Sequence, residues 1–220
     1  MRVTCISDLH GKYPEIEGGD LLIVAGDLTA TDDLPEYYRF EAWLRRQPFR
    51  KKIVIAGNHD NRLQECGVKP KDDLANCATY LCDSGTEFEG FKIWGSPWTV
   101  RFVGMNPACM AFTKETDDEL AKQWDFIPAD TDILVTHGPP RGIFDTNIYD
   151  MACGSESLRV RVDQIRPKLH VFGHIHECGE STFTLEKIRN NKVVRSTYYV
   201  NASHMDEYYR PTNKPVTVEL

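Results

Sequence analysis

Five short apolar runs along this chain each end at a residue type that commonly binds metal. The runs are RVTCIS, DLLIVAG, KKIVIAG, TDILVT and KLHVFG. Their length, their β-branched residues and their glycine or polar borders predict buried strands at about 2–7, 21–25, 52–56, 132–136 and 169–172. In α/β sheets, functional groups collect where strands end and the chain opens into loops. The pattern therefore predicts that residues far apart in sequence meet in one small volume.

Segments with helical spacing separate these strands. We expect a helix over 34–47, which stops before Pro48, and a short helix over about 61–66. A helix with an acidic start is expected over 113–127, with Thr113 or Thr116 as its N-cap. The last helix is expected over 155–167, and it ends at Pro167. The alternation of strand and helix is typical of an α/β fold.

The middle and the end of the chain follow other patterns. Short strands are expected near 78–81, 86–90 and 91–96, and a hairpin over 182–203 is expected to turn at Asn190 and Asn191 before a last strand near 215–219. Residues 96–113 have no clean period, so they form either a packed surface loop or a wall beside the substrate. We expect two packed, mixed sheets with helices on the outer faces.

Composition places the chain among ordinary globular proteins. It has 220 residues, of which 41% are hydrophobic and 27% charged, so residues 1–220 are expected to form one domain. No window approaches the length of a membrane span, and a strand begins by Arg2, which leaves no room for a signal peptide. The seven cysteines include no C-x-x-C pair, which favours reduced thiols. We therefore expect a cytoplasmic protein.

The net charge restricts the class of partner. At −7 it argues against an extended nucleic-acid surface, which needs a basic footprint. It still permits a small phosphorylated substrate, because a bound metal can reverse the local field. The oligomeric state stays open.

Candidate metal ligands gather at the ends of the predicted strands. Five of the seven histidines lie there, together with carboxylates and an asparagine. In an extended or turning segment, residues i and i+2 point to the same side, so Asp-x-His and His-x-His can each reach one metal cluster. The seven candidate ligands are Asp8, His10, Asp27, Asn58, His137, His174 and His176. One metal needs four to six ligands, so seven groups suit two divalent ions, such as Mn, Fe or Zn, with Asp27 as the candidate bridge.

The order of these motifs carries a resemblance. Asp-x-His, Gly-Asp, Gly-Asn-His-Asp, a lone His and Gly-His-x-His follow one another between residues 8 and 176. In this order the chain resembles the calcineurin-like metallophosphoesterase superfamily. The resemblance implies a four-layer sandwich, in which two mixed sheets pack face to face between outer helices.

The resemblance also implies roles for single residues. Asp8, His10, Asp27 and His176 would hold one metal, and Asp27, Asn58, His137 and His174 the other. His59 resembles the family's catalytic histidine, which protonates the leaving oxygen or stabilises charge on the phosphoryl group. A hydroxide that bridges the two metals would be the nucleophile. Manganese is the metal favoured for activity.

A finer likeness concerns the small metallophosphoesterase-domain branch of that superfamily. The matching stretches are THGPP-x-G at 136–142, GSESL at 154–158 and PKLHVFGHIHE at 167–177. That branch implies hydrolysis of small or nucleotide phosphodiesters, cyclic nucleotides included. The segment after Gly26-Asp27 reads Leu-Thr-Ala-Thr-Asp and lacks the Asp-Arg-Gly of the protein Ser/Thr phosphatases.

Several alternatives stay open at this stage. A phosphomonoesterase or a nuclease that processes nucleic-acid ends could use the same site, and a non-catalytic scaffold could share the fold. Asp60 could orient His59 as part of the catalytic group, or it could cap a helix. Arg141 could contact the substrate phosphate, or it could be a solvated loop residue.

Overall fold

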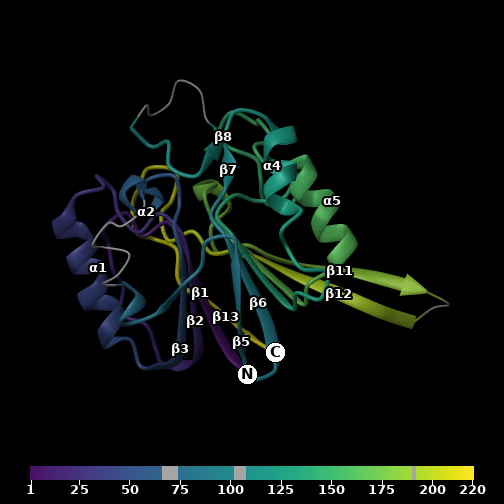
Figure 1. Ribbon diagram of the computed structural model, residues 1–220, viewed down its shortest axis with the longest axis horizontal. Coiled ribbons are helices and arrows are strands. Elements are labelled where there is room, and N and C mark those ends of the chain that lie inside the picture. The colour runs from purple at the N-terminus through teal and green to yellow at the C-terminus, as the bar shows by residue number, and fades with distance from the viewer. Residues whose placement is uncertain (66–73, 102–107, 190–191) are drawn as a thin grey trace.

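Two large mixed sheets form the centre of the protein, as a computed structural model shows (Figure 1). The structure describes residues 1–65, 74–101, 108–189 and 192–220. The first sheet has the order β13-β1-β2-β3-β4, in which β1 to β4 run parallel and β13 pairs antiparallel with β1. Its strands are β1 (Arg2–Ile6), β2 (Gly19–Ala25), β3 (Phe49–Ile55), β4 (Thr79–Tyr80) and β13 (Val216–Glu219).

The second sheet has the order β11-β12-β10-β9-β6-β5. Its four inner strands are parallel, and the outer strands β5 and β11 are antiparallel to their neighbours. Its strands are β5 (Ser84–Phe88), β6 (Phe91–Ser96), β9 (Ile133–Thr136), β10 (Leu169–Phe172), β11 (Thr182–Arg189) and β12 (Lys192–Asn201). The hairpin of β11 and β12 extends beyond the rest of the molecule (Figure 1). A small parallel pair joins β7 (Thr99–Val100) to β8 (Thr113–Lys114).

The helices lie outside the sheets, and polar side chains fix where they begin. Helix α1 (Leu34–Arg46) starts after Asp33, which accepts a hydrogen bond from the Glu36 amide. Thr116 and Ser155 cap α4 (Asp117–Trp124) and α5 (Glu156–Ile165) in the same way. Two short elements are also present, α2 (Asn61–Gln64) and the 3-10 turn η1 (His176–Cys178).

Three apolar clusters separate four layers. One cluster, which includes Phe40 and Val54, joins α1 to the first sheet. A second lies between the two sheets, where Ile23 and Val171 are both fully buried. A third joins the second sheet to α4 and α5 and includes Trp124. The order of helix, sheet, sheet and helix confirms the predicted four-layer α/β sandwich, and burial of these apolar faces holds the layers together.

Most predicted elements are confirmed, with corrections at their ends. Strands and helices occur at the ligand-bearing positions, but Thr113 and Lys114, expected to begin a helix, belong to β8. Thr116 is therefore the cap, and Thr113 is not. The predicted turn at Asn190 and Asn191 lies outside the described residues. No helix in the described ranges is long and apolar enough to cross a membrane.

Candidate metal centre

The seven predicted ligands come together at one end of the two sheets. Asp8 and His10 follow β1, Asp27 follows β2, and Asn58 follows β3, all in the first sheet. His137 follows β9, and His174 and His176 follow β10, in the second sheet. Potential ligand atoms lie within 4.8 Å of one another in three overlapping groups: Asp8, His10 and His176; His10, Asp27 and His59; and Asp27, His137 and His174. The convergence expected from the strand ends is therefore present.

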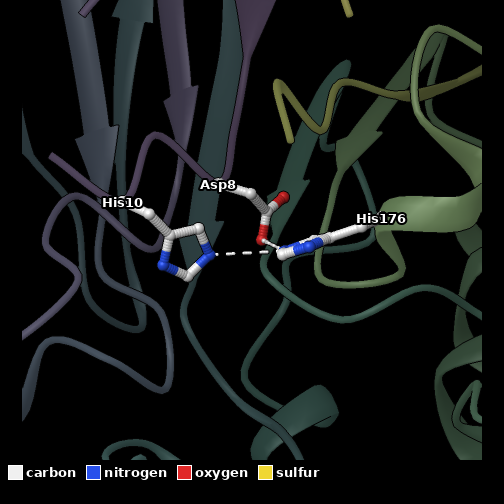
Figure 2. A group of neighbouring side chains, drawn as sticks. All are labelled: Asp8, His10 and His176. Carbon is white, nitrogen blue, oxygen red and sulfur yellow. Dashed lines mark hydrogen bonds and ion pairs between the residues drawn. The ribbon is translucent and has the colours of Figure 1, made fainter. Parts of the chain in front are cut away.

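The first group joins the two sheets directly (Figure 2). His176 Nε2 lies 3.4 Å from Asp8 Oδ1 and 3.3 Å from His10 Nε2. Asp8 is fully buried, and its carboxylate also accepts a 2.9 Å hydrogen bond from the His174 amide. Without a metal, one N–H···N hydrogen bond can join these two nitrogens, whereas a cation would use the lone pairs of both. The donor set thus fits a metal ion.

The second group centres on His137. Its Nε2 lies 2.9 Å from Asn58 Oδ1 and 3.4 Å from Asp27 Oδ1. Its Nδ1 donates to the Ala25 carbonyl at 3.0 Å. A backbone acceptor on the far nitrogen is the usual way in which a protein orients a metal-binding imidazole, because it fixes the tautomer. His137 is therefore prepared to present a lone pair to a cation beside Asp27 and His174.

Asp27 lies between the two groups. Its Oδ1 faces His137, and its Oδ2 lies 3.6 Å from His10 Nε2. The two oxygens of one carboxylate thus point to different sets of histidines. This is the arrangement required of a carboxylate that bridges two metals, the role expected for Asp27 from the sequence.

The backbone is bent sharply at the ligands themselves. Asp8, His10, Asp27 and His174 have φ values of 52°, 42°, 51° and 69°, in a region that non-glycine residues seldom adopt. Such residues cost about 1–3 kcal/mol each and cluster at functional sites. A Cβ atom on Gly57 would lie 2.2 Å from Asp27 Oδ1, so a glycine is required for this close approach.

The carboxylates are held in their charged form. Burial alone would raise the pKa of Asp8, but the hydrogen bond and charge of His176 outweigh it and keep the pKa below its usual range. Burial acts on Asp27 in the same sense, and the charges of His137 and His59 hold its pKa well below the ordinary value. Both groups are therefore available as anionic oxygen ligands at neutral pH.

His59 lies beside the ligands, but further from Asp27 than His10 and His137 do. Its Nε2 is 4.0 Å from Asp27 Oδ2, and its Nδ1 lies 3.3 Å from the Ala30 carbonyl and 3.2 Å from Cys109 Sγ. Burial lowers the pKa of His59, but the charge of Asp27 and the contact with Cys109 raise it to about 10 in the metal-free protein. The imidazole therefore carries a proton near Asp27.

Asp60 occupies the N-cap position of α2, which agrees with one of the two alternatives considered from the sequence. Its side chain makes no capping hydrogen bond to that helix. Its buried carboxylate instead accepts from the amides of Gly57, Leu28 and Thr29, at 2.9–3.1 Å, and from the Thr29 hydroxyl. None of its described hydrogen bonds reaches the His59 ring. Asp60 thus ties the loop that carries Asp27 to the loop that carries His59.

An open cavity of about 160 Å³ lies over the centre. Described residues of the 96–113 stretch line it, namely Val100, Cys109 and Thr113, which favours the interpretation of this stretch as a cavity wall. Arg141, by contrast, is not among the described lining residues, and it donates a 2.8 Å hydrogen bond to the Ala152 carbonyl within its own loop. The structure therefore gives Arg141 a contact within its own loop, which agrees with the loop-residue alternative.

Other lining residues were not found by sequence reasoning. They are Asn147, Ile148, Tyr149, Ile175, Glu177, Glu207 and Tyr209. They lie in loops and in the C-terminal tail, where no periodicity marks which side chain faces inward. The only signal was the proximity of Ile175 and Glu177 to the His-x-His motif.

Comparisons with known proteins agree with this geometry. Residues 1–178 match the family model described as calcineurin-like phosphoesterase. The chain is 34% identical over 247 residues to human metallophosphoesterase domain-containing protein 1, with 100% of this chain and 71% of the relative covered. It is 35% identical over 227 residues to UPF0046 protein C25E10.12 of Caenorhabditis elegans, with 90% of this chain and 78% of the relative covered.

Solved structures show the same fold at low sequence identity. The phosphopantetheinyl hydrolase PptH of Mycobacterium tuberculosis superposes with a TM-score of 0.57 at 18% identity, over 97% of this chain and 95% of that protein. The protein TT1561 of Thermus thermophilus gives 0.55 at 13% identity, over 99% of this chain and 98% of that protein. With the ligand cluster in place and most of its length matched, the chain belongs to the calcineurin-like phosphoesterase family.

Proposed function

We propose that this protein is a dinuclear-metal-dependent phosphodiesterase that hydrolyses small or nucleotide phosphodiesters, cyclic nucleotides included. The observation that carries the proposal is the convergence of seven ligand-type side chains with His59 beside them, where Asp27, Asn58, His174 and His176 line one cavity. Family membership supports the coarser statement that the chain is a metal-dependent phosphoric ester hydrolase. The diester preference rests on the charges of the cavity.

The proposed metal ligands divide into two sets that share Asp27. Asp8, His10 and His176 complete one set, and Asn58, His137 and His174 complete the other. Divalent cations held there would polarise the phosphoryl oxygens and supply a nucleophilic hydroxide from water at neutral pH. Carboxylate, amide and imidazole ligands accept Mn²⁺, Fe or Zn²⁺, and we take Mn²⁺ as the ion for assays.

His59 is the proposed proton donor to the leaving oxygen. Its Nδ1 donates to the Ala30 carbonyl, which leaves Nε2 as the nitrogen on the side of Asp27 and the cavity. Cations bound at Asp27 would neutralise the charge that raises the pKa of His59. The pKa would then fall back toward the range in which histidine exchanges protons near neutral pH. Such a group is suited to general acid catalysis.

Charges around the cavity favour a diester over a monoester. The described lining residues include Glu177 and Glu207, and neither lysine nor arginine is among them. A phosphomonoester carries a second negative charge, which here would meet these two carboxylates, and beyond the metals and His59 no described lining residue offsets it. A diester carries one charge and avoids that repulsion.

The walls of the cavity favour a small substrate. Val100, Cys109 and Thr113 form one side, and residues 147–149 lie among the other lining residues. A cavity of about 160 Å³ between such segments suits a small phosphodiester better than a long polymer. This supports a small-molecule enzyme over a nuclease that acts on nucleic-acid ends.

A panel of substrates tests the proposal. Protein loaded with Mn²⁺ is assayed with bis(p-nitrophenyl) phosphate, p-nitrophenyl phosphate and a single-stranded oligonucleotide, and its metal content is measured in parallel. We expect the highest kcat/KM for the aryl diester. A preference for the monoester would favour a phosphomonoesterase, and release of nucleotides from the oligonucleotide at a higher rate would favour a nuclease. Metal-loaded protein that cleaves none of the three would favour a scaffold.

A further inference from the structure

Tyr209 lies directly against the proposed metal centre. Its ring centroid is 5.0 Å from that of His10 and 4.8 Å from that of His176, in edge-to-face geometry at both. The residue lines the cavity and is nevertheless 56% exposed. One side of the ring therefore packs on two ligands, and the remainder is available to a molecule that enters the cavity.

The loop that carries Tyr209 is tied together by its own side chains. The Asp206 carboxylate accepts 2.9 Å bonds from the amides of Tyr208 and Arg210 and a 2.6 Å bond from Arg210 Nε. At the base of the loop, His204 Nδ1 donates to the Asn213 carbonyl at 2.6 Å. These bonds hold Tyr209 at a φ of 58°, a conformation that aromatic residues seldom adopt. A strained residue over a reaction centre is a recognised starting point for a functional hypothesis.

Other cavity walls share the character of this ring. Ile148, Tyr149, Ile175 and Val100 line the same cavity, and the first two are more than half exposed. The charged lining residues outside the ligand cluster and His59, within the described ranges, are Glu177 and Glu207. Apolar and aromatic walls with acidic neighbours suit a flat, uncharged ring and disfavour a group with further negative charge.

We propose that Tyr209 is a specificity-determining residue that binds the aromatic ring of an ester group, an aryl ring or a nucleobase, on a singly charged phosphodiester. The phosphate of that substrate lies at the metal centre, and its ring packs on the exposed part of Tyr209. The inference rests on the proposed phosphodiesterase function and names the substrate feature that the cavity selects.

Binding of two inert anions tests this inference without turnover. Diphenylphosphinate and dimethylphosphinate each carry one negative charge, and neither has an ester bond to hydrolyse. The affinities of Mn²⁺-loaded protein for both are measured by calorimetry. Tyr209→Asn removes the ring and keeps a residue that tolerates the left-handed backbone. We expect the affinity ratio of diphenyl- to dimethylphosphinate to fall about 5- to 10-fold in this variant.

Two variants control for other effects. Tyr208→Asn is the matched control, because Tyr208 is 69% exposed and is not among the described lining residues; it should keep the wild-type ratio. Tyr209→Phe should also keep the ratio, because the ring and not the hydroxyl makes the contact. If Tyr209→Asn loses its native circular dichroism, Tyr209→Gly repeats the test with another residue suited to this backbone. An unchanged ratio in the folded variant overturns the inference.

Kinetics separate failure of this inference from failure of the proposed function. Bis(p-nitrophenyl) phosphate and methyl p-nitrophenyl phosphate have the same leaving group and differ by one ring. We expect Tyr209→Asn to lower the ratio of their kcat/KM values about 5- to 10-fold. If the wild type cleaves both diesters and the ratio is unchanged, the role of Tyr209 is wrong and the function stands. If the wild type cleaves neither, the proposed function fails, and the phosphinate affinities still decide whether Tyr209 binds a ring.

Discussion

The two large sheets meet at one centre but bring different chemistry to it. The loops after β1, β2 and β3 in the first sheet supply both carboxylates, the amide of Asn58, and His10 and His59. The loops after β9 and β10 in the second sheet supply three ligands, and all are histidines: His137, His174 and His176. One sheet therefore provides the anionic ligands, and the other provides only imidazole nitrogens.

This division implies that metal binding joins the two sheets. Each proposed metal takes ligands from both of them, and Asp27 contributes to both metals. The buried contacts between the sheets, such as those around Ile23 and Val171, hold the two sets of loops in register before any ion binds. The apolar layer thus fixes the relative positions of the ligand loops. The first sheet supplies the negative charge of the site, and the second sheet supplies the histidines that complete each ligand set.

Removal of the shared carboxylate should have the largest effect. Asp27→Asn keeps the shape of the side chain but removes the only charge placed between the two ligand groups. We expect kcat/KM for bis(p-nitrophenyl) phosphate to fall at least about 100-fold, because even residues that only support metal ligands cost 10- to 100-fold. Metal content, measured by mass spectrometry, should fall in parallel.

The matched control changes the same residue type near the opposite end of β2. Asp20 lies in β2, near the end remote from Asp27, and pairs with Arg50. Asp20→Asn should leave the rate and the metal content near wild type. Full activity in Asp27→Asn would mean that the first sheet does not supply the required charge, and the comparison between the sheets would lose its basis.

Replacement of His59 should have the next largest effect and a different signature. His59→Asn is expected to lower kcat about 100-fold, the lower end of the range for loss of a general acid. Metal content should stay at the wild-type level, because His59 is not a proposed metal ligand. Geometry alone would also permit a metal between His10, Asp27 and His59. A loss of bound metal in this variant would therefore make His59 a ligand and contradict its assigned role.

The strand-end positions of the ligands could be predicted from sequence because each depends on local pattern alone. A buried apolar run fixes a strand, and the residue after it lies at the sheet's edge, so Asp27 and His137 could be placed before their neighbours were known. The prediction of two sheets between outer helices rested on buried apolar runs that alternate with segments of helical spacing, and the family resemblance added the four-layer order.

The side chains that approach the centre from elsewhere could not be predicted in this way. Tyr209 reaches it because Asp206 bonds to the amides around it, and Cys109 because its loop passes His59. Neither arrangement leaves a period in the sequence. Asp60 shows the same limit: its motif position was visible, but its partners Leu28 and Thr29 come from a different loop.

Removal of the metals should weaken the packing between the sheets. If both sheets hold the ions, metal at a free concentration of 100 times its dissociation constant stabilises the folded state by about 2.7 kcal/mol. For a chain of this length that corresponds to a melting temperature about 5 to 10 °C higher. Melting is followed by circular dichroism. We expect EDTA to abolish this increase in melting temperature in wild-type protein. In Asp27→Asn the chelator should have little effect, and equal melting of loaded and chelated wild-type protein would contradict the role of the metals between the sheets.

The smallest expected effect concerns His170, the histidine within β10, which lies away from the metal centre. His170 is fully buried in β10, and its Nε2 donates to the Thr136 hydroxyl at 2.9 Å. Burial lowers the pKa of His170 from 6.5 to about 3. Below pH 6.5 the unfolded chain therefore takes up a proton that the folded chain refuses until about pH 3. The stability that this residue contributes is present above pH 6.5 and is lost as the pH falls toward 3.

His170→Gln should remove this dependence, because the glutamine amide can still donate to Thr136 and does not titrate. At pH 5, the folded protein keeps this imidazole neutral, which lowers the free energy of unfolding of wild-type protein by about 2 kcal/mol relative to pH 7. Urea unfolding of chelated protein measures the free energy of unfolding at both pH values. We expect its decrease between pH 7 and pH 5 to be smaller by about this amount in His170→Gln than in wild type. His204→Gln should recover less stability at pH 5, because the Asn213 carbonyl opposes the lowering of the His204 pKa by burial. If wild type and His170→Gln lose stability in parallel between pH 7 and pH 5, burial does not hold the His170 imidazole neutral in the folded chain, and the assigned pH dependence is wrong.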